Sequence, residues 1–179
     1  ITMIKERRSV RKYKDEKVDR ETMREIVDIA RWAPSWVNYQ IARYTLVDDE
    51  EIIKEIAEHG VNGFVYNIDT LRTAKGVAVL SFVKGKSGTY DKEYITSKGN
   101  SWEVFDAGIA CQTFCLAAHA KGVGTCIMGV IDDKSIAKIV NLPEDETVAA
   151  LIVYGYEDGE HAAPNKRKDV DEIMRFVDR

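Results

Sequence analysis

The sequence predicts an α+β fold, and three observations lead to that prediction. Helical and strand-like segments are mixed along the chain, but they lack the strict strand–helix–strand alternation of a parallel sheet. The segment from Trp102 to Lys121 is apolar on nearly every side, which predicts a central buried helix and a candidate subunit interface. Residues 77–83 form a continuous apolar run of strand length, typical of an interior strand.

Capping residues, helix breakers and hydrophobic spacing place the other elements. Asp19 can cap a helix because its carboxylate can accept the free N–H groups of the first turn, and Pro34 bars that helix from continuing. Asp48 and Asp49 precede a second helix, and Gly122 suits the left-handed residue that ends the central one. The predicted helices cover residues 19–33, 48–60, 102–121, 132–140 and 169–178, and the predicted strands cover residues 44–47, 77–83, 125–128 and 147–154.

Length and composition indicate one globular unit. The chain has 179 residues, so we expect residues 1–179 to form a single domain. Its 45% hydrophobic and 31% charged residues are typical of a globular protein, and no apolar run is long enough to cross a membrane. Residues 84–101 carry glycines among charges and tyrosines and are expected to form an irregular loop or lid.

Charge and cysteine content limit the partners. The formal net charge of −4 argues against a general nucleic-acid surface, and three cysteines without a secretory signal predict a cytoplasmic protein with reduced thiols. Cys111, Cys115 and His119 share one helix face and could be metal ligands. Buried thiols are the simpler interpretation, because no fourth ligand has a matching spacing. We therefore expect no metal, no nucleic acid and no membrane partner.

Two cationic segments stand out against the acidic total. Arg7, Arg8 and Arg11 lie around Ser9, and guanidinium groups pair bidentately with phosphate oxygens while a serine hydroxyl adds a further bond. The alternatives are a solvated basic face or an arm that touches nucleic acid. A second group at residues 165–168, taken alone, is typical of a solvated surface.

Two polar segments could contact a planar ligand. Residues 33–40 follow a helix and place serine, asparagine and glutamine among aromatic residues, which suits the donors and acceptors of a heteroaromatic ring or an ordinary turn. Residues 122–129 contain three glycines without the spacing of a dinucleotide fingerprint. Gly129 could let a planar ligand approach the backbone.

Taken together and in this order, these segments resemble the nitroreductase family of FMN-dependent oxidoreductases. The resemblance covers residues 4–177. Arg7-Arg8-Ser9-x-Arg11-x-Tyr13 is similar to the first family signature, and Pro34-Ser35-x-x-Asn38-x-Gln40 is similar to the second. It implies a three-layer fold in which helices flank a central, mainly antiparallel sheet, with FMN at the interface of a homodimer.

The resemblance also implies which residues bind the cofactor. The amino-terminal segment and the late basic pair would hold the phosphate and ribityl chain. The second signature would reach the flavin bound mainly by the other subunit. Asn67 would face the ring edge, and the backbone near Gly129 would pass beside N5. The implied set is Arg7, Arg8, Ser9, Arg11, Pro34, Ser35, Trp36, Asn38, Gln40, Asn67, Met128, Gly129, Lys166 and Arg167.

The chain departs from the family pattern at two places. Many members follow the glutamine with Pro-Trp, whereas Gln40 precedes Ile41 and Ala42 here. Some members carry a lysine near the flavin pyrimidine at the position of Thr70. Arg72 or backbone amides are the alternatives for that role.

The implied activity passes a hydride from NADH or NADPH to flavin N5, after which an electron-poor small aromatic acceptor such as a nitroaromatic or quinone takes the electrons. No side chain needs a catalytic role, because the chemistry belongs to the cofactor. Three alternatives stay open: a flavin-binding carrier or sensor without turnover, a dehalogenase or flavin-cleaving specialisation of the same fold, and a nucleic-acid-binding protein. An aromatic wall would suit a flat acceptor, its candidates being Trp36, Tyr39, Tyr90, Tyr94 and Trp102.

Overall fold

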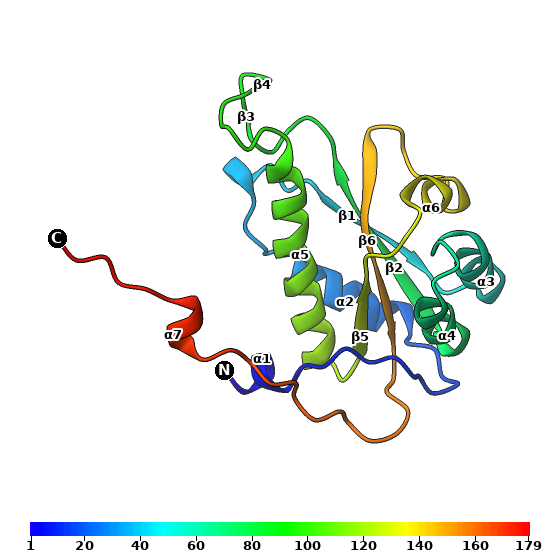
Figure 1. The fold of residues 1–179 in the computed structure, drawn as a ribbon. Helices are drawn as coiled ribbons and strands as arrows, with labels where there is room; N and C mark the ends of the chain where they lie inside the picture. Colours follow the sequence, from blue (N-terminus) through cyan, green and yellow to red (C-terminus); the bar gives the residue numbers. More distant parts are fainter.

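A four-stranded antiparallel sheet forms the centre of the computed structural model, which describes residues 1–179. Its strand order is β1-β2-β6-β5, with each neighbouring pair antiparallel (Figure 1). The strands are β1 (Ala42–Val47), β2 (Gly76–Val83), β5 (Gly124–Met128) and β6 (Glu146–Gly155). The predicted strands are confirmed, each within two residues at either end.

Helices cover both faces of this sheet, which confirms the expected three layers (Figure 1). One face packs against α2 (Arg20–Ala30) and α5 (Ser101–Ala120), and the other packs against α3 (Glu50–His59), α4 (Val65–Thr73) and α6 (Asp133–Ile139). Successive strand side chains point to opposite faces, so Ala78 and Leu80 enter the first core and Val77 and Val79 enter the second.

Local signals account for most helix ends. The Asp19 carboxylate accepts from the Thr22 amide, and Gly122, at φ +74°, ends α5 as predicted. The Val123 amide then donates to the Ala118 carbonyl at 2.9 Å, a bond that satisfies one of the free carbonyls of the last turn. The helix after Asp19 is shorter than predicted, since α2 ends at Ala30, four residues before Pro34.

The remaining elements are small and lie outside the layers. Residues 84–100, called the lid below, contain a hairpin of β3 (Thr89–Tyr90) and β4 (Glu93–Tyr94). The expectation of a helix over residues 169–178 is wrong in length. Only α7 (Val170–Ile173) forms, in an exposed tail that leads away from the body (Figure 1), because a short helix without a packing surface is not stable. The other two elements are α1 (Thr2–Glu6) and the short η1 (Trp36–Asn38).

No helix is both long enough and apolar enough to span a membrane.

Candidate functional site

A cavity of about 590 Å³ lies at the β5 edge of the sheet. We call it the edge cavity. Three segments form its wall: the N-terminal arm (residues 7–14), α4 and β5. Its lining residues are Arg11, Lys12, Phe64, Tyr66, Asn67, Asp69, Thr70, Thr73, Cys126 and Ile127. Two of the predicted site residues, Arg11 and Asn67, therefore share one cavity although 56 positions separate them in the chain.

Backbone pairing holds the N-terminal arm against β5. Ser9 and Thr125 form a parallel bridge, and the Val10 amide donates to the Thr125 carbonyl at 2.9 Å. The arm approaches so closely that a Cβ at Gly124 would lie 2.7 Å from Val10 Cγ2. Gly124 is thus required for the close packing that sets the arm, rather than only for a turn.

The arginines of the arm carry unneutralised charge. No carboxylate lies within ion-pair distance of Arg7, Arg8 or Arg11. Arg7 and Arg8 line a smaller cavity of about 160 Å³ together with Thr125 and His119, which we call the arginine cavity. Arg8 also donates from Nε to the Ala162 carbonyl at 2.9 Å, so part of its guanidinium fixes the base of the C-terminal tail. The arm can still supply cationic donors to an anion.

Asn67 connects α4 to the loop after β5. Its Nδ2 donates to the Val130 carbonyl at 3.0 Å, which leaves its side-chain oxygen free to accept. The side chain of Met128 is buried in the core, so only its backbone could meet a ligand. Open space surrounds the position where a Cβ of Gly129 would lie, as a ligand passing beside the backbone requires.

Thr70, at the position of the missing family lysine, and Arg72, its candidate substitute, lie in different cavities. Thr70 lines the edge cavity and donates to the Tyr66 carbonyl at 3.0 Å. Arg72 pairs with Asp69 at 2.8 Å and lines a different groove. Lys12 is the second cation of the edge cavity, with Asp158 3.1 Å from its Nζ. Lys12 belongs to the N-terminal cationic run, but it was not among the residues predicted to bind the cofactor.

Aromatic residues at the edge cavity were also missed. The rings of Phe64 and Tyr66 lie 5.4 Å apart at the start of α4, and both remain partly or largely exposed. The sequence feature that could have identified them is the aromatic pair just before Asn67. It was hard to recognise because α4 begins without a side-chain cap.

The second predicted segment lies elsewhere in the same chain. Pro34, Ser35 and Gln40 line a separate cavity of about 540 Å³ beside Asp106 of α5. His119, which lines the arginine cavity, is thirteen residues further along that helix. At 1.5 Å per residue the two places are about 20 Å apart along α5. One chain therefore does not bring the arginines and this loop onto one small ligand.

Residues 35–40, called the flavin loop below because of the family resemblance, hold an unusual backbone. Val37, Asn38 and Gln40 have φ values of 45°, 55° and 51°. A β-branched residue such as valine is rarely found in this left-handed region, and such conformations concentrate at functional sites. The Ser35 hydroxyl accepts from the Gln40 amide at 2.9 Å and closes the loop on itself.

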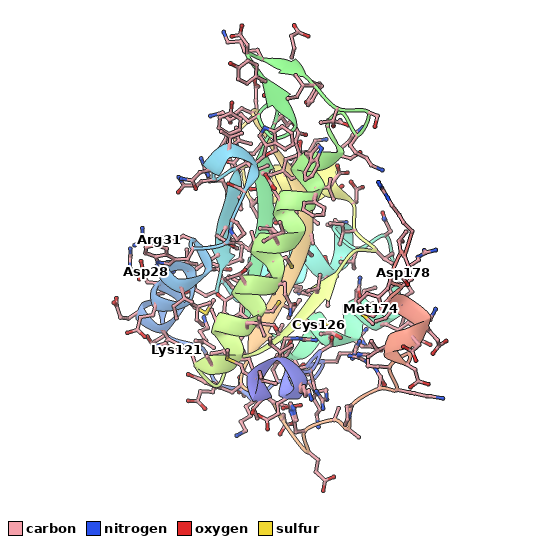
Figure 2. The ribbon with its side chains drawn as sticks, turned by 90° about the vertical axis from the view of Figure 1, so that its left-hand side faces the viewer. Asp28, Arg31, Lys121, Cys126, Met174 and Asp178 are labelled. Atoms are coloured by element: carbon pink, nitrogen blue, oxygen red, sulfur yellow. The ribbon has the colours of Figure 1, made fainter.

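Lys166 and Arg167 lie in the exposed tail, and the structure does not bring them into contact with the arm. Arg167 donates only to the nearby Asn165 carbonyl at 3.0 Å. The base of the tail does run beside the arm, since the Lys14 amide donates to Tyr156 O and the Asp158 amide donates to Lys12 O. Figure 2 shows Met174 and Asp178 of this tail on the opposite side of the view from Asp28 and Arg31 of α2.

His161 fastens the base of the tail to the arm. Its Nδ1 lies 2.7 Å from the Glu157 carboxylate and its Nε2 lies 2.8 Å from the Glu6 carbonyl. Both partners are acceptors, so the doubly protonated ring satisfies both bonds. The Glu157 hydrogen bond accordingly raises the pKa of His161 above its ordinary value.

Cys126 is the thiol of the edge cavity, near the centre of Figure 2. Burial raises the pKa of this thiol, although Arg11 and Arg7 oppose the shift. The neutral thiol is a weak nucleophile, so the geometry gives Cys126 a packing role. Cys111 and Cys115 are buried within α5.

Comparison with known proteins shows which family the chain matches. The model of the nitroreductase family matches residues 4–156. An FMN reductase [NAD(P)H] from Bacillus subtilis is 30% identical over 164 residues, covering 87% of this chain and 65% of that protein. An iodotyrosine deiodinase from Thermotoga neapolitana is 25% identical over 163 residues, covering 87% of each chain. A solved FMN-dependent nitroreductase from Clostridium difficile R20291 is 28% identical, with a TM-score of 0.77 over 97% of this chain and 96% of the other.

Proposed function

Since the chain belongs to the nitroreductase family, we infer that it is an enzyme of that type, an FMN-dependent oxidoreductase that uses NADH or NADPH as reductant. The observation that carries this function is the group of three arginines without a carboxylate partner, next to a cavity lined by Asn67 and two aromatic rings.

The donor set suits FMN. A phosphate needs cationic donors, which Arg7, Arg8 and Arg11 supply, together with the Ser9 hydroxyl. A flat ring with polar edges needs apolar walls and a few placed amides, as the edge cavity provides through Ile127 and Asn67.

Each residue then has a definite task. The arm arginines neutralise the phosphate, and the free side-chain oxygen of Asn67 accepts from the ring edge. Lys12 places positive charge in the edge cavity, where it stabilises negative charge that develops on the ring. When bound, FMN supplies the redox chemistry by accepting a hydride from the nicotinamide and returning the electrons to an acceptor. The chain needs no acid or base for this, so we assign none.

We propose that two chains build each flavin site. The flavin loop and the arginines lie about 20 Å apart along α5, so the loop of one chain would complete the site of the other. The outward face of α5 supports this arrangement, because Val104 and Phe105 are 61% and 59% exposed in the single chain. Exposed apolar faces of this kind mark interaction surfaces. Lys166 and Arg167 could then reach a phosphate only after the tail moves or crosses to the partner.

The acceptor in this proposal is a small electron-poor aromatic, such as a nitroaromatic or a quinone. Phe64 and Tyr66 support it, because partly exposed rings at the cavity mouth can stack on a flat molecule.

An absorbance spectrum of the purified protein, followed by anaerobic additions of NADH and NADPH, tests the proposed function. We expect a flavin spectrum that either reductant bleaches and that a nitroaromatic or quinone restores. Bound flavin that neither reductant bleaches would instead identify a carrier or sensor. A colourless protein that takes up no added FMN would overturn the proposal.

A further inference from the structure

We propose that Asp106 is a positioning residue that fastens the flavin loop to the lid and thereby sets the loop for its role in the flavin site. This inference rests on the proposed function for the meaning of the loop. The contacts that carry it are independent of that function.

The conformation of the flavin loop must be stabilised by contacts with other segments. Three of its residues have left-handed backbones, one of them the β-branched Val37, and such a conformation persists only when its surroundings fix it. The Ser35–Gln40 bond closes the loop but does not attach it to the body. The attachment comes from Asp106, whose Oδ2 accepts from the Trp36 amide at 2.9 Å.

The same oxygen also holds the lid. Asp106 Oδ2 accepts from the Ser87 hydroxyl at 2.6 Å, so a single carboxylate of α5 joins two segments that lie 51 positions apart in the chain. Asp106 is only 3% exposed and no Lys, Arg or His pairs with it. A buried carboxylate without a cation depends on its hydrogen-bond donors, which makes this junction sensitive to their geometry.

An aromatic contact strengthens the same junction. The Trp36 indole donates from Nε1 to the Thr89 carbonyl of the lid at 2.9 Å. Its ring lies 4.9 Å from that of Trp102, with an interplanar angle of 55°. The loop, the lid and α5 therefore meet at Trp36, and the Asp106 carboxylate accepts from both the loop and the lid.

Glu103 offers a matched comparison. It is also buried on α5, one turn before Asp106, and its Oε1 accepts from the Gly85 amide at 2.6 Å and the Tyr94 hydroxyl at 3.1 Å. Both donors belong to the lid. Removing Glu103 should therefore loosen the lid alone, whereas removing Asp106 should release the lid and the loop together.

The test compares Asp106→Ala, Asp106→Asn, Ser87→Ala and Glu103→Ala in the full-length protein. Four properties are measured for each variant. They are the steady-state kinetics with NADH and a quinone, the FMN content, the hydrogen exchange of amides 36–40 and the circular dichroism of the Trp36–Trp102 pair. Asp106→Ala should raise KM at least about tenfold while FMN content stays within about twofold, because the arginines that hold the phosphate are untouched. It should also speed exchange in the loop and weaken the tryptophan signal.

Asp106→Asn should restore the parent values, since an amide oxygen can accept from both donors. The rate of hydrogen exchange in the loop of Ser87→Ala should lie between the rates in the parent and in Asp106→Ala. If Asp106→Ala fails to fold, Ser87→Ala takes its place in the comparison. Parent-like loop exchange in Asp106→Ala, or equal loop effects from Glu103→Ala, would overturn the proposal. A parent protein without flavin would defeat the proposed function, while loop exchange and the tryptophan signal would still test Asp106.

Discussion

At the scale of single residues, Arg7 is the most direct test of phosphate binding. It lines the arginine cavity, and no carboxylate lies within ion-pair distance of it. We predict that Arg7→Ala loses about 1.5–3 kcal/mol of FMN binding, or about ten- to a hundredfold in Kd. Equilibrium titration of the apoprotein with FMN measures this loss. Arg24→Ala, which removes an exposed guanidinium of α2, is the control. An Arg7→Ala protein that binds FMN as tightly as its parent would refute the phosphate assignment.

The contacts of His161 predict that the stability of the base of the tail depends on pH. Its folded pKa is raised by Glu157 and the Glu6 carbonyl, against smaller opposing effects of desolvation and then Arg8. The His119 ring stacks on the His161 ring with centroids 6.4 Å apart. Because the folded pKa lies above the unfolded one, the stabilisation is complete below the ordinary imidazole pKa and is lost as pH rises through the raised value. NMR titration of the His161 ring should therefore give a midpoint above the ordinary one. Glu157→Gln should move it back, and an unchanged midpoint in that variant would contradict the assignment.

The sequence allowed some of these residues to be predicted and hid others. Arg7 and Arg11 could be named because a charge cluster marks them, and Asn67 could be named only through the family resemblance. Arg11 and Asn67 line one cavity. Lys12 was hidden within a run of cations. Asp106 was hidden because a single acid on an apolar helix gives no local sign of the donors that tertiary folding brings to it.

At the scale of elements, α5 has two different faces although its sequence is apolar all round. One face is buried against the sheet and α2, and the other exposes Val104 and Phe105. We predict that Val104→Lys leaves the monomer folded but weakens self-association, because the lysine must be desolvated at the proposed interface. Light scattering after size exclusion measures the mass, and far-ultraviolet circular dichroism checks the fold. Glu55→Lys on α3, in the opposite layer, should leave the mass unchanged. A Val104→Lys protein with the parent's mass and dissociation constant would exclude this face as the interface.

The elements that sequence reasoning located are those with strong local signals. Asp19, Asp49 and Asp132 cap helices. Asp19 was recognised alone from residue type and spacing, and each of the other two was recognised as one of a pair of adjacent aspartates. The helix α4 was missed because Phe64 precedes it without a capping bond and its apolar residues follow no clear stripe. The last predicted helix is too long because its periodic residues have no surface in the chain to pack on.

At the scale of the whole molecule, the proposed function requires two chains to share each flavin site. The cavity lined by Arg7 and Arg8 lies beside His119 near the end of α5, whereas the flavin loop lies beside Asp106 near its start. The tail leaves the body (Figure 1). Its Ile173 and Phe176 side chains are exposed. Sequence reasoning anticipated the two halves from the family resemblance. It could not place them in space, because their separation is set by the length of α5 and by the hydrogen bond from the Trp36 amide to Asp106.

Complementation between two defective subunits is the most direct test of this central claim. One subunit carries Arg7→Ala with Arg11→Ala, the other has residues 35–40 replaced by a glycine–serine run of equal length, and both are co-expressed with different tags and purified as the mixed pair. In the mixed dimer one site combines two altered halves, whereas the other combines two intact halves. We predict about half the parent's NAD(P)H-dependent quinone reduction, well above that of either altered homodimer. A mixed dimer no more active than the two altered homodimers would contradict the shared site.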